Sequence, residues 1–228
     1  MNNCVWCVEE MDTPLQWSNL FVPKQKQLLC KSCTASLKKI DIQICLTCSK
    51  PSLAKQCTDC KEWKRIYYNQ DPLLKNISVF EYNRFIKEMI TKWKYRGDYQ
   101  IGFAFQSTFK QTFQAMFHHL PSSPHIVPIP LSKEREQHRA FNQAEMLAAF
   151  LTQDTKQLFI RMKGEKQSKR NRKERMDSKN PFILRRPVIK PVVLVDDIYT
   201  TGRTLRHAAE LLKQAGCSEV YSYTLIRG

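Results

Sequence analysis

The sequence contains no hydrophobic run long enough to cross a membrane, and no leader-like segment precedes its first cysteine, Cys4. We therefore expect a cytoplasmic protein without membrane insertion. Histidine is scarce as well, and the five histidines form no cluster with the spacing of metal ligands. Acidic residues number 21 against 37 lysines and arginines, which gives a formal net charge of +16. This excess of positive charge favours polyanionic partners, of which nucleic acid is the commonest.

Cysteine, in contrast, is abundant and regularly spaced. Eight of the nine cysteines form four Cys-x-x-Cys pairs: Cys4/Cys7, Cys30/Cys33, Cys45/Cys48 and Cys57/Cys60. Two such pairs complete a closed tetrahedral zinc site. Sequential pairing predicts two zinc ribbons with one structural zinc ion each, although interleaved pairing also satisfies the spacing. A secreted disulfide framework is the alternative, and it fits poorly with the expected cytoplasmic location.

The cysteine pairs divide the chain into two predicted domains. Residues 1–65 hold all the paired cysteines and few periodic apolar runs, so this zinc-ribbon domain is expected to need metal for its folding. Residues 66–228 alternate strand and helix patterns, which favours the α/β class with a mostly parallel sheet and flanking helices. We predict strands at 77–82, 126–129, 158–162, 192–195 and 220–226, and helices at 84–95, 100–120, 143–152 and 202–216.

The stretch from residue 192 to residue 204 is the most informative motif. Four apolar residues form a predicted buried strand, and Asp196 and Asp197 follow at its carboxyl end, where open α/β sheets bind ligands. Adjacent carboxylates there accept hydrogen bonds from two vicinal hydroxyl groups. A hydroxyl-rich turn then begins a helix, whose free N–H groups and dipole favour a phosphate. The residues of this turn are Thr200, Thr201, Gly202, Arg203 and Thr204. An ordinary turn explains one acid and one threonine but not the whole run, so the motif predicts a sugar-phosphate site.

Basic residues suited to a diphosphate group occur in two further segments. The predicted strand at 126–129 continues through Pro130 into a loop that carries Lys133, Arg135 and Arg139. The segment 161–190 has twelve basic and three acidic residues, a net charge of +9. Its cations with a predicted diphosphate role are Lys166, Lys169 and Arg170. Cationic side chains at strand ends suit an anionic group such as a diphosphate. The same charge also suits single-stranded DNA, and a solvated surface loop is the third interpretation.

These segments resemble two known families. The run 192–204 is similar to the phosphoribosyl pyrophosphate (PRPP) motif of type I phosphoribosyltransferases. The whole chain resembles the ComF family, through Pro-Ile-Pro-Leu at 128–131, Phe-Asn-Gln at 141–143, Gln-Ser at 167–168 and Lys-Tyr-Arg-Gly-Asp at 94–98. Ala140 departs from the family pattern, which usually has glycine there, and alanine adopts far fewer positive-φ conformations.

The ComF resemblance implies a double zinc ribbon joined to a phosphoribosyltransferase-like domain, and an association with DNA uptake during natural transformation in bacteria. The resemblance to the PRPP motif implies that Asp196 and Asp197 hold the ribose hydroxyls and stabilise positive charge as catalytic residues. It also implies that residues 200–204 hold the 5′-phosphate and that Mg²⁺ accompanies PRPP. Single-stranded DNA and a competence helicase are the implied partners. The sequence leaves transfer itself open, because no residue identifies an acceptor. The alternative is a non-catalytic zinc-ribbon adaptor that docks a helicase or another uptake component.

Overall fold

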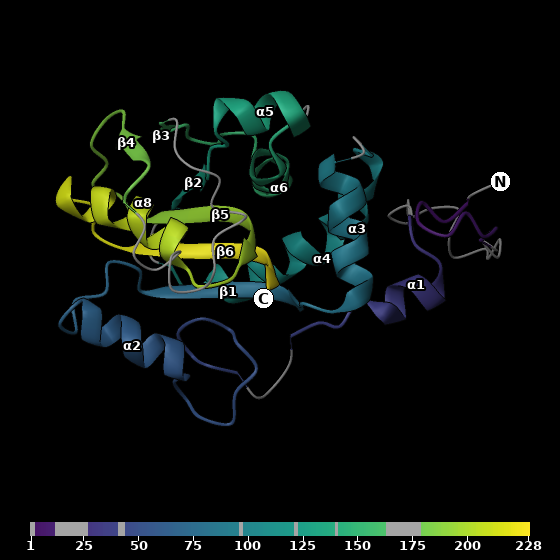
Figure 1. The fold of residues 1–228 in the computed structure, drawn as a ribbon, viewed down its shortest axis with the longest axis horizontal. Coiled ribbons are helices and arrows are strands. Elements are labelled where there is room, and N and C mark those ends of the chain that lie inside the picture. The colour runs from purple at the N-terminus through teal and green to yellow at the C-terminus, as the bar shows by residue number, and fades with distance from the viewer. Residues whose placement is uncertain are drawn as a thin grey trace.

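A four-stranded parallel sheet forms the centre of the molecule in the computed structural model (Figure 1). The structure describes residues 3–11, 27–40, 44–95, 98–120, 123–139, 141–162 and 179–228. Every neighbouring pair of strands in the sheet runs parallel, which confirms the predicted α/β class. The strands lie in the order β1 (Lys75–Glu81), β6 (Val220–Arg227), β5 (Val192–Tyr199) and β2 (His125–Pro128).

Four helices of the described residues agree with the helices predicted from the sequence. The helices in this part of the chain are α1 (Lys31–Ser36), α2 (Thr58–Ile66), α3 (Arg84–Tyr95), α4 (Gln100–Phe117), α5 (Lys133–Arg139), α6 (Gln143–Leu151) and α8 (Arg203–Gln214). Those that agree with the prediction are α3, α4, α6 and α8. The bounds of α3 are those predicted, because its apolar residues recur at helical spacing. Asn142 caps α6, as its side chain accepts a hydrogen bond of 3.0 Å from the Ala144 N–H.

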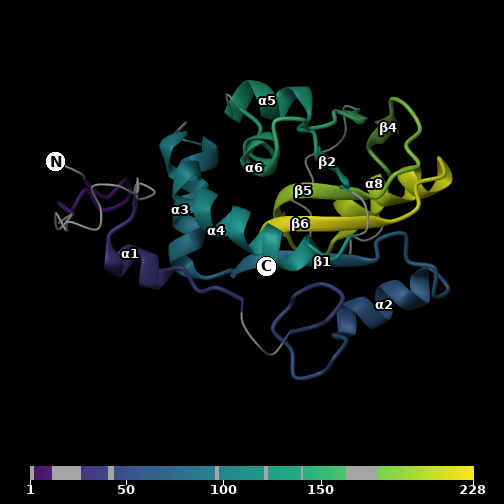
Figure 2. The same ribbon diagram turned by 180° about the vertical axis from the view of Figure 1, so that it is seen from behind.

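Helices cover both faces of the sheet because successive side chains of a strand point to opposite sides. Val193 and Val195 of β5 pack in one core with α3, α4 and α6. Val192 and Leu194 pack in the other core with α8. Accordingly, α8 lies in front of the sheet in Figure 1, and α4 lies in front of it in Figure 2, which shows the molecule from behind.

Two elements differ from the sequence prediction. The strand predicted at 158–162 is β3 (Phe159–Arg161), and it pairs with β4 (Phe182–Leu184) as a separate antiparallel sheet of two strands. The prediction of a loop after Pro130 is wrong, because residues 133–139 form the helix α5. This helix buries no side chain, so its sequence lacks the apolar periodicity from which a helix is predicted. Acidic residues in its first turn and basic residues in its last turn stabilise it through the helix dipole.

The first cysteine-rich module packs at the side of the sheet that α3 and α4 cover. Cys4, Leu29 and Cys33 belong to the same apolar core as these two helices. The chain then runs along the edge of the sheet, where the Ile40 N–H donates to the Val79 carbonyl at 2.9 Å. This segment therefore covers an edge strand that would otherwise expose unpaired backbone groups.

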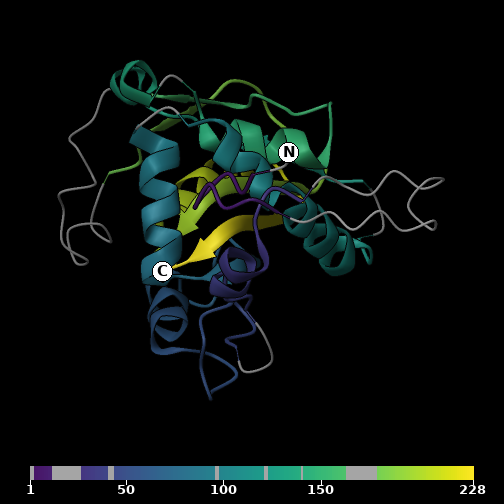
Figure 3. The same cartoon turned by 90° about the vertical axis from the view of Figure 1, so that its right-hand side faces the viewer.

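The second cysteine-rich module packs beneath the opposite face. Its four cysteines belong to the core that contains α8, and in Figure 3 the C-terminal end of β6 lies directly above the segment that carries α2. The domain boundary at residue 65, at the end of α2, stays a prediction. Among the helices of the described residues, none has the length and apolar character that a membrane crossing requires.

Candidate functional site

The loop between β5 and α8 carries the predicted phosphate-binding residues. The sequence predicts that this strand ends at residue 195, but β5 extends to Tyr199. Asp196 and Asp197 therefore belong to the second half of the strand. Gly202 is the N-cap of α8 and has a φ of 80°, a conformation that residues with a side chain rarely adopt. A Cβ atom there would collide with the Tyr199 hydroxyl and the Arg206 guanidinium. Glycine at position 202 is thus required by backbone conformation and by space.

A pocket of about 260 Å³ opens above this loop and brings together residues from three helices and one strand. Asp196 and the loop residues form its floor, α3 contributes Lys94 and Tyr95, and α5 contributes two arginines. The predicted site residues that line it are Arg135, Arg139, Asp196, Thr200, Thr201, Gly202, Arg203 and Thr204. Carboxylate, hydroxyl and cationic groups therefore converge where the sequence placed a sugar-phosphate site.

The two adjacent carboxylates have different charge states. Burial, followed by the charge of Asp197, raises the pKa of Asp196 to about 7. Burial also opposes ionisation of Asp197, but the ammonium group of Lys94 forms an ion pair with it and holds the pKa of Asp197 below its ordinary value. Near neutral pH, Asp197 is therefore a carboxylate, whereas Asp196 changes between acid and carboxylate.

Three arginines lie around the two carboxylates. Arg135, Arg139 and Arg161 line a polar cavity of about 100 Å³ together with Asp196 and Asp197. Arg139 donates to the Gln143 side chain at 3.2 Å, and its guanidinium lies 5.3 Å from the centre of the Tyr95 ring. Burial, followed by the charge of Arg135, lowers the pKa of Arg161 to about 10, so Arg161 is still charged at neutral pH. The cavity is suited to an anion with several charges.

The structure also describes two other predicted site residues, Lys133 of the diphosphate set and Arg203 of the phosphate-binding turn. Lys133 is exposed on the outer side of α5 and is not among the residues that line either cavity. Arg203 lines the pocket, but its guanidinium donates to the hydroxyl of Tyr67, the C-cap of α2, at 2.8 Å and to Glu210 of α8 at 3.1 Å. Lys166, Lys169 and Arg170 lie outside the described residues. Their diphosphate role stays a prediction.

Sequence reasoning had assigned no site role to two of these cations, Lys94 and Arg161. Lys94 is buried and follows Ile90 by four residues, so it lies on the core-facing side of α3. Burying a charged lysine costs free energy unless a carboxylate pairs with it. The core-facing position of Lys94 in the helical pattern could therefore have indicated a buried carboxylate partner. The sequence does not indicate a site role for Arg161, because β3 has only three residues and its alternation does not define which side chains face inward.

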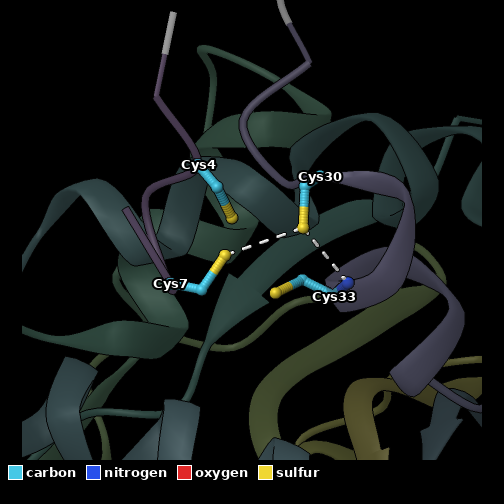
Figure 4. Close-up of side chains that lie close together, drawn as sticks. All are labelled: Cys4, Cys7, Cys30 and Cys33. Carbon is cyan, nitrogen blue, oxygen red and sulfur yellow. Dashed lines mark hydrogen bonds between the residues drawn. The ribbon is translucent and has the colours of Figure 1, made fainter. Parts of the chain in front are cut away.

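The eight paired cysteines form two separate clusters, which confirms the sequential pairing. Cys4, Cys7, Cys30 and Cys33 make the first cluster (Figure 4), and Cys45, Cys48, Cys57 and Cys60 make the second. Within each cluster the sulfur atoms all lie within 4.8 Å of one another. The Cys7 and Cys30 sulfurs are 3.7 Å apart, and the Cys48 and Cys57 sulfurs are 3.6 Å apart.

These distances fit a four-coordinate zinc ion. Four thiolates at the usual zinc–sulfur distance of about 2.3 Å lie about 3.8 Å from one another in a tetrahedron. Cys30 and Cys57 each precede the first residue of a helix, α1 and α2 respectively. Each module is therefore built in the same way, with two cysteines on a turn and two at the start of a helix. Either cluster can hold a structural zinc ion.

Comparison with known proteins gives matches in both parts of the chain. The phosphoribosyl transferase domain family matches residues 155–228. Competence protein ComFC of Bacillus subtilis (strain 168) is 39% identical over 229 residues, which cover 98% of this chain and 94% of that protein. Competence protein ComFC of Streptococcus pneumoniae is 29% identical over 98% of this chain and 99% of that protein.

A further relative matches over part of its length. The DNA utilization protein YhgH of Salmonella typhi is 32% identical over 116 residues, which cover 47% of this chain and 51% of that protein. The matches to the ComFC proteins, in contrast, extend through the cysteine modules and the sheet alike. The chain belongs to the ComF family of competence-associated proteins, and it carries a phosphoribosyltransferase domain.

Proposed function

We propose that this ComF-family protein binds PRPP in the pocket between β5, α8, α3 and α5. One observation carries the proposal: adjacent carboxylates, a hydroxyl-rich loop at a helix start and four cations from α3, α5 and β3 line two cavities with shared lining residues at the carboxyl end of β5. Asp196 and Asp197 accept hydrogen bonds from the ribose hydroxyls. Residues 200–204 bind the 5′-phosphate through backbone N–H groups and hydroxyls.

The diphosphate of PRPP then lies toward α5. Arg135 and Arg139 neutralise it, as the sequence predicted, and we add Arg161 and Lys94, which line the same cavity. Mg²⁺ binds mainly to carboxylates and substrate phosphates, so Asp196 and the diphosphate are its proposed ligands. When bound, the ion neutralises the leaving group during transfer of the phosphoribosyl unit, and the two carboxylates stabilise positive charge on the ribose.

Calorimetry tests this proposal. The parent protein is titrated with PRPP and Mg²⁺ beside Asp196→Asn and Asp197→Asn. The exposed Asp154 supplies a matched control, Asp154→Asn, because it lies outside both cavities. We expect the parent and the control to bind equally and the two site variants to bind at least about tenfold more weakly, the effect of losing one charge-assisted hydrogen bond. No binding by the parent, or undiminished binding by both site variants, would contradict the proposal.

We also propose that the chain binds single-stranded DNA during DNA uptake. The net charge of +16 and the basic segment 161–190 support this role. So does a groove of about 510 Å³ beside the first cysteine cluster, which is lined by Trp6, Arg84, Lys87, Glu88, Thr91 and Lys92. The half-buried ring of Trp6 lies 5.6 Å from the Lys92 ammonium, so the groove offers an aromatic surface among cations, as strand-binding proteins do.

Salt dependence tests the DNA proposal. The affinity for single-stranded DNA should fall with salt with a log–log slope of roughly −0.7 per phosphate neutralised. The Lys87→Gln variant should lower this slope by about that amount, whereas Lys110→Gln, on the exposed side of α4 and away from the groove, should leave it unchanged. Absence of binding at low salt would instead favour the adaptor role, and capture of a competence helicase by the zinc-ribbon module would then support it.

A further inference from the structure

The second cysteine cluster lies directly beneath the phosphate loop, and two buried side chains connect them. The first is Trp63 of α2, the helix whose first turn contains Cys60. Its indole N–H donates to the Thr201 carbonyl at 2.7 Å, across 138 positions of the sequence. Trp63 is 1% exposed, so this hydrogen bond is shielded from water. Its ring also contacts the guanidinium of Arg206, at 4.5 Å from the ring centre.

The second connection is Arg227, the last residue of β6. Its Nε donates to the Cys48 carbonyl at 3.1 Å, and its Nη2 lies 3.5 Å from the Cys48 sulfur. The other end of the same guanidinium donates to the carbonyls of Tyr199 and Thr200, at 3.1 and 3.0 Å. A single buried side chain therefore joins a cysteine of the cluster to the first residues of the loop.

These contacts fix the direction in which the loop presents its N–H groups. In a trans peptide, the carbonyl of one residue and the N–H of the next point in opposite directions. Arg227 and Trp63 draw the Thr200 and Thr201 carbonyls toward the cluster. The N–H groups of Thr201 and Gly202 must then point away from the cluster, toward the side on which the loop lines the pocket. N–H groups arranged in this way form an anion-binding concavity.

We propose that the second cysteine cluster, with its zinc ion, positions the phosphate loop through Trp63 and Arg227, and that the first cluster has no such role. The inference rests on the proposed PRPP site and assigns it two positioning residues. Because metal binding supplies much of the folding energy of such small modules, loss of zinc from the second cluster releases α2 and Cys48. The loop then loses the groups that orient its carbonyls.

The two clusters provide an internal comparison. They have the same four ligands and the same arrangement, but in the described part of the chain the hydrogen bonds of the first cluster reach only its own module and the residues near it. Cys30 and Cys57 occupy equivalent places, each immediately before a helix. Cys30→Ser and Cys57→Ser therefore remove equivalent ligands from the two clusters.

The test measures hydrogen exchange of the amides in residues 199–205 of the full chain without PRPP, together with zinc content and Mg²⁺–PRPP affinity. Trp63→Phe keeps a six-membered aromatic ring but removes the pyrrole ring and, with it, the N–H donor. Trp93→Phe is its control, since Trp93 is fully buried and its indole nitrogen has no hydrogen-bond partner among the described groups. We expect Trp63→Phe to keep both zinc ions, to speed loop exchange about tenfold and to weaken PRPP binding by a similar factor. Trp93→Phe should change neither quantity more than about twofold.

Each cysteine variant should lose one zinc ion, but only Cys57→Ser should speed loop exchange and weaken PRPP binding. Equal effects of the two cysteine variants, or unchanged loop exchange in Trp63→Phe, would overturn the inference. Faster loop exchange without weaker binding would overturn the positioning role. If Cys57→Ser fails to fold, Trp63→Phe decides the question. If the parent does not bind PRPP, the proposed function fails, and loop exchange still tests the connection between cluster and loop.

Discussion

The affinity for PRPP should depend on pH through Asp196. Burial and the neighbouring Asp197 raise the pKa of the Asp196 carboxyl to about 7. In the folded protein this group is therefore mostly protonated at pH 6 and mostly ionised at pH 8. The ionised form offers two charged oxygens as acceptors, whereas the protonated form uses one oxygen as an O–H donor and accepts more weakly. Binding of the ribose hydroxyls should therefore strengthen as the pH rises through 7.

The size of the effect follows from the ionised fraction. For a pKa near 7, this fraction is roughly 10% at pH 6, roughly 50% at pH 7 and roughly 90% at pH 8. The PRPP affinity should thus rise about ninefold from pH 6 to pH 8. The same group lowers stability with rising pH: its folded-state pKa lies above the ordinary value near 4, so its contribution to the free energy of unfolding decreases between about pH 4 and pH 7.

Calorimetry at pH 6, 7 and 8 with constant Mg²⁺ and ionic strength measures this dependence. The phosphates of PRPP also titrate in this range, so the control is Asp196→Asn, which keeps the contribution of the ligand and removes that of the protein. The affinities of the parent and the variant should converge near pH 6 and separate toward pH 8. The same pH dependence in both proteins would refute the assignment of the titration to Asp196.

Three further predictions concern stability and metal content. Gly202→Ala should lower the free energy of unfolding by about 3 kcal/mol through backbone strain and collision, whereas Gly216→Ala, with a φ of 93° but open space, should cost about 1 kcal/mol in a urea titration. Arg206→Met should cost about 3 kcal/mol because it breaks a buried ion pair, whereas Arg84→Met, at an exposed pair, should cost less than about 0.5 kcal/mol. Thiol modification should release about two zinc ions per chain into a colorimetric chelator, and release of one would mean that only one cluster holds zinc.

Much of the fold could be predicted from short segments of the sequence, because local residue patterns determine where these helices, strands and cysteine turns form. The periodic apolar residues of α3, the buried run that begins β5 and the spacing of the cysteine pairs each depend on neighbours in the chain. Asp196 and Gly202 could be placed in one site for the same reason, since one strand and one helix start position them.

Contacts between distant segments could not be predicted in this way. Lys94 and Arg161 reach the carboxylates only after α3 and β3 have packed beside β5. The hydrogen bond from Trp63 to Thr201 joins residues whose separation in sequence gives no local signal. The sequence therefore predicts the loop at residues 200–204 and the cations Arg135 and Arg139, but not Lys94 and Arg161 or the hydrogen bond from Trp63.

A crystal structure of the protein grown with PRPP and Mg²⁺ would show directly where each part of the ligand binds. We expect the ribose hydroxyls on Asp196 and Asp197, the 5′-phosphate on the backbone of residues 200–204, and the diphosphate beside Arg135 and Arg139. Binding of the 5′-phosphate at any other place, or a pocket that stays empty at saturating PRPP, would contradict the proposed PRPP site.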